Sequence, residues 1–258
     1  ELLLERINED QPAVSVIGGM ASAATQPGEN CLIFGSNVYR DGAVAVLVHG
    51  DVAIRSIVSQ GCRPIGEHFV ITKAERNVIQ ELGGVPAYQR LIEVYATLAT
   101  HEQEMLRRGL HVGRVVSEYQ DKFEQGDFLV RNVMGVDQES GAIVLGDYVR
   151  PGQTVQFHVR DADTADGELK QMLAAIKHAP EAKPRAALLF TCNGRGTRLF
   201  PEPNHDAEAI GDALGNSPLA GFFAAGEMGP VGGKNFLHGF TASIAVFESA
   251  APKSLPDA

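Results

Sequence analysis

The stretch AALLFTCNGRG, residues 186–196, is a short apolar run that breaks abruptly into a thiol, an amide, two glycines and an arginine. This order predicts a buried strand that delivers a polar loop to an edge of a sheet. Glycine lets backbone N–H groups approach a ligand closely, and Arg195 offers a planar set of donors suited to a carboxylate or phosphate. The loop therefore predicts a site for a small anion. The alternative is a tight turn whose arginine pairs with a carboxylate elsewhere in the fold.

Composition narrows the class of protein. With 258 residues, 44% of them hydrophobic, the chain can bury the core of one large domain or two smaller ones. The formal net charge of −10, with no concentrated basic patch, argues against nucleic acid and anionic membranes as partners. No run approaches the roughly 18 apolar residues that a membrane span requires. The chain begins with Glu rather than Met, so we expect a fragment.

The cysteines indicate the compartment. Cys31, Cys62 and Cys192 are an odd number in a chain too long to need disulfide bonds, so we expect free thiols and a cytoplasmic location.

The first part of the chain has the pattern of a sheet that meanders between Gly, Asn, Asp and Pro clusters. Residues 86–108 change to helical spacing, with Pro86 where a first-turn proline is tolerated and Gly109 placed to stop the helix. One long amphipathic helix is expected there, and it divides the chain into two packed units. The strands predicted before it are 14–17, 31–34, 43–49, 52–59, 69–72 and 78–82.

In the second part of the chain, segments with the helical spacing of apolar residues are mixed with segments that have the pattern of strands, which predicts an α+β fold overall. A helix over 163–178 carries an apolar stripe, and a second helix runs from about 203 to 214 with Asn204 as a plausible N-cap. With the long helix, this unit has three main helices. Its predicted strands are 127–136, 142–145, 154–159, 186–190, 219–223 and 241–247.

Four other stretches combine glycine with polar groups in a way that a plain sheet does not require. Residues 59–66 contain Gly61, Cys62 and Arg63, and mirror the chemistry of the loop at 192–196. Arg131, beside Asn132, is expected on the apolar face of a strand, where it must find an internal or bound partner. Residues 221–229 join two aromatics to the single carboxylate of Glu227, the expected internal partner of Arg195 or Arg63, and residues 234–238 follow on an expected flexible loop.

The sequence contains no strong motif for catalysis or for metal binding. The eight histidines show no H-E-x-x-H and no C-x-x-C companion, so neither a metal site nor a cofactor is expected. His205, Asp206 and Glu208 fit cap and surface chemistry better than a set of metal ligands. Cys192 with His238 as its base is the enzymatic alternative, with Arg195 lowering the pKa of the thiol, but no third orienting group is identifiable.

Five motifs in order across the chain resemble the FIST family, named for F-box and intracellular signal transduction proteins. They are Gly61–Gly66, Gly126–Asn132, Gly152–Asp161, Cys192–Gly196 and Gly221–Glu227. The resemblance implies the later part of a FIST N-terminal domain over 1–84 and a FIST C-terminal domain over 85–248, followed by a tail at 249–258. It also implies a sensory role, because such domains occur beside signalling modules or an F-box and are proposed to bind small ligands such as amino acids.

These inferences predict a cytoplasmic sensory domain that binds an amino acid or related carboxylate in a pocket between the two units. Arg195 and Arg63 are expected to hold the carboxylate, and aromatic rings to cover its apolar part. The alternatives are an enzyme that uses Cys192 and a protein-docking module, perhaps a homodimer through the sheet of the first unit; the signalling partner is unknown. The expected ligand-binding residues are Gly61, Cys62, Arg63, Arg131, Asn132, Cys192, Asn193, Gly194, Arg195, Gly196, Phe222, Phe223, Gly226, Glu227, Phe236 and His238.

Overall fold

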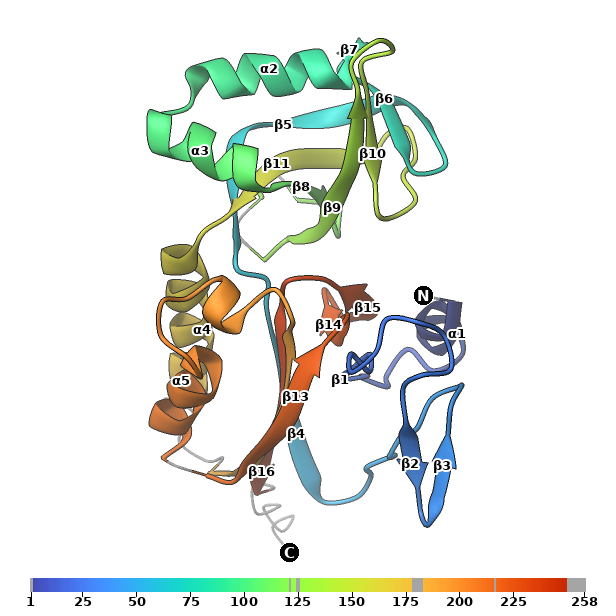
Figure 1. Cartoon of the computed structure of the whole chain (residues 1–258), viewed down its shortest axis with the longest axis vertical. Coiled ribbons are helices and arrows are strands. Elements are labelled where there is room, and N and C mark those ends of the chain that lie inside the picture. The colour runs from blue at the N-terminus through green and yellow to red at the C-terminus, as the bar shows by residue number, and fades with distance from the viewer. Residues whose placement is uncertain (1, 121, 124–125, 178–182, 216, 250–258) are drawn as a thin grey trace, which may run out of the picture. The chain divides into compact units, whose positions relative to one another are not determined.

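The computed structural model describes residues 2–120, 122–123, 126–177, 183–215 and 217–249. Its chain packs into two compact units that are discontinuous in sequence. Unit 1 comprises Glu1–Ser59, Glu168–Pro230 and Asn235–Ala258, and unit 2 comprises Gln60–Gly167 and Val231–Lys234. Figure 1 follows the chain through both units by colour.

Unit 1 is built on a sheet in which β12 is central, with parallel β13 on one side and antiparallel β16 on the other. The order is β13, β12, β16, β4, so β13 and β4 form its edges. The apolar run at residues 186–190 lies in β12, and the prediction of a strand there is confirmed. The strands are β4 (Val52–Ser59), β12 (Pro184–Cys192), β13 (Leu219–Ala224) and β16 (Ala242–Ser249).

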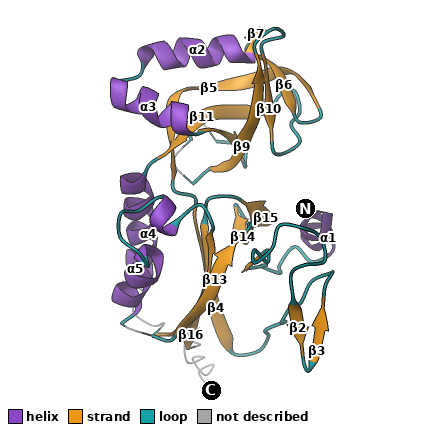
Figure 2. Ribbon diagram, in the orientation of Figure 1, coloured by secondary structure: helices purple, strands orange, loops and turns teal. Residues whose placement is uncertain are grey.

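Two helices cover one face of this sheet, as Figures 1 and 2 show. They are α4 (Ala162–Lys177) and α5 (His205–Leu214). The predicted stripe of α4 is buried at Leu169, Leu173 and Ile176, and packs with α5 and the inward side chains of the sheet. Burial of this apolar area is the main stabilising contribution to the unit. The helix predicted over 163–178 is therefore confirmed for its described residues, which end at 177.

Smaller elements complete unit 1. Asn8 on α1 exchanges hydrogen bonds with Asn235, which ties the start of the chain to β15. The elements are α1 (Leu2–Asp10), β1 (Gly18–Gly19), β2 (Leu32–Phe34), β3 (Asn37–Tyr39), β14 (Glu227–Val231) and β15 (Lys234–His238), of which β1, β14 and β15 form one sheet and β2 and β3 a hairpin. The prediction of a loop at 234–238 is therefore wrong.

Unit 2 is an antiparallel sheet in the order β10, β9, β8, β11, β5, β6, β7 that closes on itself through a further β10–β6 pairing. Its interior is apolar, and α2 packs against it. Figure 1 shows α2 and α3 beside these strands. The elements are β5 (Cys62–Glu75), β6 (Val78–Leu82), β7 (Val85–Pro86), α2 (Ala87–Thr97), α3 (Thr100–Arg108), β8 (Leu110–Val115), β9 (Phe128–Asp137), β10 (Ala142–Leu145) and β11 (Thr154–Arg160).

The α+β fold class is confirmed, but three further local predictions, one helix and two strands, are wrong. The expected single helix over 86–108 is two helices, because the backbone is extended at Leu98 and Ala99 and the Glu102 side chain accepts a hydrogen bond from the Ala99 N–H to start the second. The segments 14–17 and 43–49 are not strands, although their apolar patterns predicted them. A strand pairs its backbone groups with those of a neighbouring strand, whereas in 14–17 the Val16 N–H and the Val14 carbonyl bond to the side chain of Asn235, and 43–49 is exposed along its whole length. No helix among the described residues is long and apolar enough to cross a membrane.

Candidate functional site

The polar loop after β12 is organised around a buried ion pair. Nε of Arg195 donates to Oδ2 of Asp206 and Nη2 donates to Oδ1, both at 2.8 Å. Thr191 Oγ also donates to Oδ2 at 2.6 Å, and Nδ1 of His205 lies 3.1 Å from Oδ1. The carboxylate therefore meets four polar partners from the end of β12, the loop and the start of α5. The guanidinium also lies over the Phe200 ring, with 5.2 Å to its centroid.

The partner of Arg195 is thus an internal carboxylate, but not the expected one. Asp206 takes the place predicted for Glu227, and Arg63 pairs with Glu102 at 2.9 Å and Asp161 at 3.1 Å. Burial alone would raise the pKa of Asp206, but the hydrogen bonds and charge of Arg195, together with Thr191 and His205, hold that pKa below its ordinary value. Arg195 is buried, with 1% of its surface exposed. Two of its three guanidinium nitrogens, Nε and Nη2, donate hydrogen bonds to Asp206.

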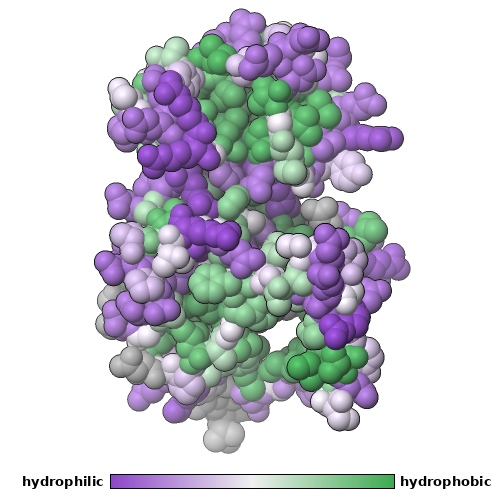
Figure 3. Space-filling view, viewed as in Figure 1, coloured by the Kyte–Doolittle hydropathy of each residue, from purple (hydrophilic) through white to green (hydrophobic). Residues whose placement is uncertain are grey.

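A cavity of about 260 Å³ lies beside this ion pair, between β13 and the start of α5. One exposed ring stands at it: Phe223, 48% exposed, is on the same face of β13 as Leu219, which packs with the residues of α4 and α5. The Phe222 ring, 44% exposed, turns to the other face, where its centroid lies 5.3 Å from that of Phe190. Gly196 has a φ of 56°, and a Cβ there would sit 3.1 Å from the Phe223 ring, so glycine suits both the turn and the close approach. Figure 3 shows hydrophobic surface where β13 lies in Figure 1. The cavity is lined by Leu189, Thr191, Gly196, Asn204, His205, Asp206, Ala207, Leu219, Ala220, Gly221, Phe222 and Phe223.

This cavity brings together three predicted site residues, Gly196, Phe222 and Phe223. Sequence analysis missed the contributions of Thr191 and of the start of α5. A signal existed, because an acidic residue in the first turn of a predicted helix follows the Gly-Arg-Gly loop by ten residues. Asn204 was identified as the N-cap and precedes α5 with a φ of 60°, yet its side chain makes no capping hydrogen bond.

A second buried acid lies at the start of β14. Glu227 is fully buried; Oε2 accepts hydrogen bonds from the Thr241 N–H at 3.1 Å and Oγ1 at 2.9 Å, whereas Oε1 accepts none from an N–H or O–H of the described residues. Burial raises the pKa of Glu227 to about 7, while Thr241, the Cys192 thiol and the charge of Arg195 act in the opposite direction. The carboxyl group therefore changes charge near neutral pH.

We expect Glu227→Gln to stabilise the protein in alkaline solution only. The folded state holds the Glu227 proton up to about pH 7, whereas an unfolded glutamate loses it near 4.5, so this residue favours folding in acid and that contribution is lost as the pH rises through 7. A pKa difference of this size corresponds to about 3 kcal/mol at pH 8. Urea unfolding at pH 8 and pH 4.5 measures the effect. An equal change at both pH values would contradict the assignment.

Among the described residues, those that contact or act on the Cys192 sulfur include no histidine. The Gly194 N–H donates to Sγ at 3.4 Å, and the other neighbours that affect it are the Phe240 backbone and Glu227. Burial, followed by the charge of Glu227, raises the pKa of this thiol. His238 instead lies 3.0 Å from the Gly229 carbonyl through Nε2. The Cys192 and His238 pair of the enzymatic alternative is therefore not formed, and the expected lowering of the thiol pKa by Arg195 is wrong.

The remaining predicted site residues are distributed over both units. Cys62 is buried in unit 2, and Arg131 pairs with Asp147 at 2.8 Å. The pocket expected between the two predicted units stays a prediction. Unit 2 also contributes Gly61, Arg63 and Asn132, and unit 1 contributes Asn193, Gly194, Gly226 and Phe236.

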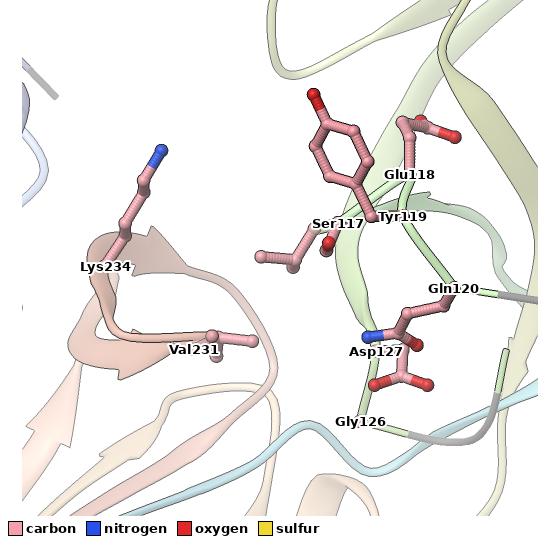
Figure 4. A pocket seen from close by; sticks show the side chains of 10 residues that line it. Ser117, Glu118, Tyr119, Gln120, Gly126, Asp127, Val231 and Lys234 are labelled. Carbon is pink, nitrogen blue, oxygen red and sulfur yellow. The ribbon is translucent and has the colours of Figure 1, made fainter.

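Unit 2 has a cavity of its own, of about 480 Å³. Figure 4 shows Val231 and Lys234 at one side of it and Tyr119 and Glu118 at the other. Its lining carries charges of both signs, and Glu118 is engaged by the backbone N–H and the hydroxyl of Thr154. None of the predicted site residues lines this cavity. The lining residues are Val116, Ser117, Glu118, Tyr119, Gln120, Gly126, Asp127, Val231, Gly232 and Lys234.

Comparison with known proteins identifies the family of the chain. Family models match over most of the chain, the FIST N domain at residues 1–85 and the FIST C domain at 85–230. The chain belongs to the FIST family, whose domains are associated with signal transduction. The family boundary at 85 falls inside unit 2, so the two compact units do not follow the two family segments.

The relatives are longer than this chain. An uncharacterized protein of Mycobacterium tuberculosis is 50% identical over 248 residues, which cover 95% of this chain and 64% of the relative. An uncharacterized protein of Mycobacterium bovis is 44% identical over 246 residues, with the same coverage. An uncharacterized protein of Methanocaldococcus jannaschii is 28% identical over 95 residues, which cover 37% of this chain and 19% of that protein. The chain thus spans 64% of the length of the mycobacterial relatives.

Proposed function

We propose that this chain is a cytoplasmic sensory module that binds an amino acid or a related small carboxylate, and that its recognition site is the cavity between β13 and α5. The cavity itself is the observation that carries the proposal. Its walls are mostly apolar, with a few converging polar groups from Thr191, Asn204 and His205, which is the usual make-up of a small-molecule site. Its volume of about 260 Å³ suits a ligand of amino-acid size.

The buried ion pair between Arg195 and Asp206 fixes the polar part of the cavity wall. Asp206 lines the cavity and is fixed by Arg195, Thr191 and His205, so the polar wall is preorganised before any ligand arrives. The role of Arg195 in this proposal is therefore to position Asp206. The exposed Phe223 ring supplies the apolar contact of the site, whereas the Phe222 ring faces the other side of the sheet and packs against Phe190.

The experiment is a thermal unfolding screen against the standard amino acids at millimolar concentration. A ligand that binds only the folded state raises the melting temperature in proportion to the logarithm of its concentration. We expect at least one amino acid to do so for the wild type, to lose its effect on Phe223→Ala, and to be recovered unchanged.

Tyr148→Ala is the matched control, because Tyr148 is another exposed aromatic ring, at 68%, and lies in unit 2. This variant should respond to the ligand as the wild type does. A panel in which no amino acid shifts the melting temperature, or in which both variants lose the response equally, would contradict the proposal.

A further inference from the structure

β13 is an edge strand whose outer side has open backbone groups. Its inner side bonds to β12, because the Ala187 N–H donates to the Pro218 carbonyl and the Asn193 N–H donates to the Ala224 carbonyl, both at 2.9 Å. In a parallel ladder alternate residues face the same neighbour, so the even-numbered residues of β13 face β12. The odd-numbered ones, beginning with Leu219, therefore turn their N–H and C=O groups outward.

Part of this outer side is already used. The Ser22 hydroxyl donates to the Phe223 carbonyl, and the N–H of Met20 and the carbonyl of Gly226 form a bond just beyond the strand. Within the part of the chain that the structure describes, the outward backbone groups of residues 219–222 have no hydrogen-bond partner and form the open part of the edge. An unpaired edge of this kind is a template for a further strand, and proteins recognise extended peptides in this way.

The cavity runs along the same edge. Five consecutive residues of β13, 219–223, form one wall, and Asn204 with the first residues of α5, 205–207, forms the other. Side chains of a strand alternate between the two faces of a sheet. A strand added beside β13 therefore directs every second side chain toward the α5 side, where the cavity can receive it.

The charges of the lining suit a residue within a peptide better than a free amino acid. A free amino acid carries an ammonium and a carboxylate that both need partners. Among the described residues that line the cavity there is no Lys or Arg, and the carboxylate of Asp206 already has four partners. A peptide bond is neutral, and the open N–H and C=O groups of β13 are its natural partners.

Charge also selects the flanks of such a peptide. The helix α5, whose start bounds the cavity, carries exposed carboxylates at Glu208 and Asp212 and contains no Lys or Arg, and exposed Glu202 precedes it by three residues. The chain has a formal net charge of −10. Basic residues beside the segment that pairs with β13 are therefore favoured, both in the complex and during encounter.

We propose that the cavity beside β13 recognises an extended peptide segment with basic flanks, which adds to the sheet as a strand and places an apolar side chain between β13 and α5. This inference rests on the proposed function, since it uses the same cavity. It specifies that the cavity binds the amino acid as one residue of a partner protein, so that the sensory module binds that protein directly.

The test is calorimetric titration with the capped octapeptide acetyl-Lys-Lys-Leu-Thr-Val-Thr-Lys-Lys-amide. Its central residues alternate as a strand requires. One control peptide replaces both threonines by proline, which removes backbone donors and prevents strand pairing. A second replaces the four lysines by glutamate. We expect the first peptide to bind at least about tenfold more tightly than either control, and Phe223→Ala to weaken it by about tenfold, as loss of a central aromatic contact does.

Tyr148→Ala should bind the octapeptide as the wild type does. Equal affinity for the octapeptide and its proline version, or for wild type and Phe223→Ala, would overturn the inference. The amino-acid screen separates the two proposals. Free amino acids that stabilise the protein without peptide binding leave the proposed function standing and refute peptide recognition. Absence of both responses refutes both.

Discussion

Asp206→Ala is expected to lower the free energy of unfolding by about 3–5 kcal/mol, the usual cost of removing one partner from a buried ion pair. The buried guanidinium of Arg195 would lose the acceptor of both its hydrogen bonds, and Thr191 would lose its acceptor. Leaving a charge buried without its partner costs far more than the pair contributes when intact. Chemical denaturation by urea, followed by circular dichroism, measures the difference.

The controls separate this loss from a general effect of changing α5. Glu208→Ala removes an exposed carboxylate two residues away and should stay within about 0.5 kcal/mol of the wild type. Asp206→Asn keeps the shape and should fall between the two. Adding Arg195→Met to Asp206→Ala removes the unpaired charge, so the double variant should be less destabilised than the sum of the single ones. Additive losses would contradict the ion-pair account.

Acid is expected to destabilise unit 2 well above the pH at which its carboxylates protonate. His111 and His158 are cross-strand neighbours on β8 and β11, 5% and 2% exposed. Burial lowers the pKa of each to about 4, helped at His111 by the charge of Arg160 and at His158 by His111. Gly113 makes the packing possible, since a Cβ there would lie 2.3 Å from Cε1 of His158.

The direction of the change in stability with pH follows from which state binds more protons. Below about pH 6.5 the unfolded histidines take up protons that the folded ones refuse until about pH 4, so stability falls as the pH drops through this window. Each histidine accounts for about 1.4 kcal/mol per pH unit inside the window, and for about 3 kcal/mol across all of it. The neutral histidines therefore stabilise the unit near neutral pH, and that contribution disappears in acid.

The measurement is urea unfolding at pH values from 7.5 to 4.5 in the Glu227→Gln background, because Glu227 titrates in unit 1 with the opposite sign. His111→Gln should remove close to half of the pH dependence between 6.5 and 4.5. His68→Gln, a change at an exposed histidine of the same unit, is the matched control variant. A pH profile that His111→Gln does not change would refute the assignment.

Much of the fold was predictable because long apolar runs and helical stripes report burial directly. The strands of the unit 1 sheet and the stripe of α4 were predicted for that reason. The break between α2 and α3 was not, since Leu98 and Ala99 carry no helix-breaking signal. The segment 43–49 is a continuous apolar run like that of a buried strand, but pairing depends on a neighbouring strand and not on local pattern.

Several residues of the site were predictable from the sequence, but the ion pair that they form was not. Glycine, aromatic and arginine residues marked Gly196, Phe222 and Phe223, which the structure brings to one cavity. The partner of Arg195 was a choice between several carboxylates, and only the tertiary fold places Asp206 rather than Glu227 against it. The open edge of β13 depends on the order of strands in a sheet, which no local spacing reveals.

The central claim is that recognition occurs beside β13 in unit 1, and amide chemical shifts test it most directly. Titrating the isotope-labelled chain with the amino-acid panel and the octapeptide should move the resonances of residues 204–207 and 219–223, which bound the cavity. Residues 117–120, at the cavity of unit 2, should stay in place. Shifts confined to 117–120, with 204–207 and 219–223 unmoved at saturation, would contradict the account.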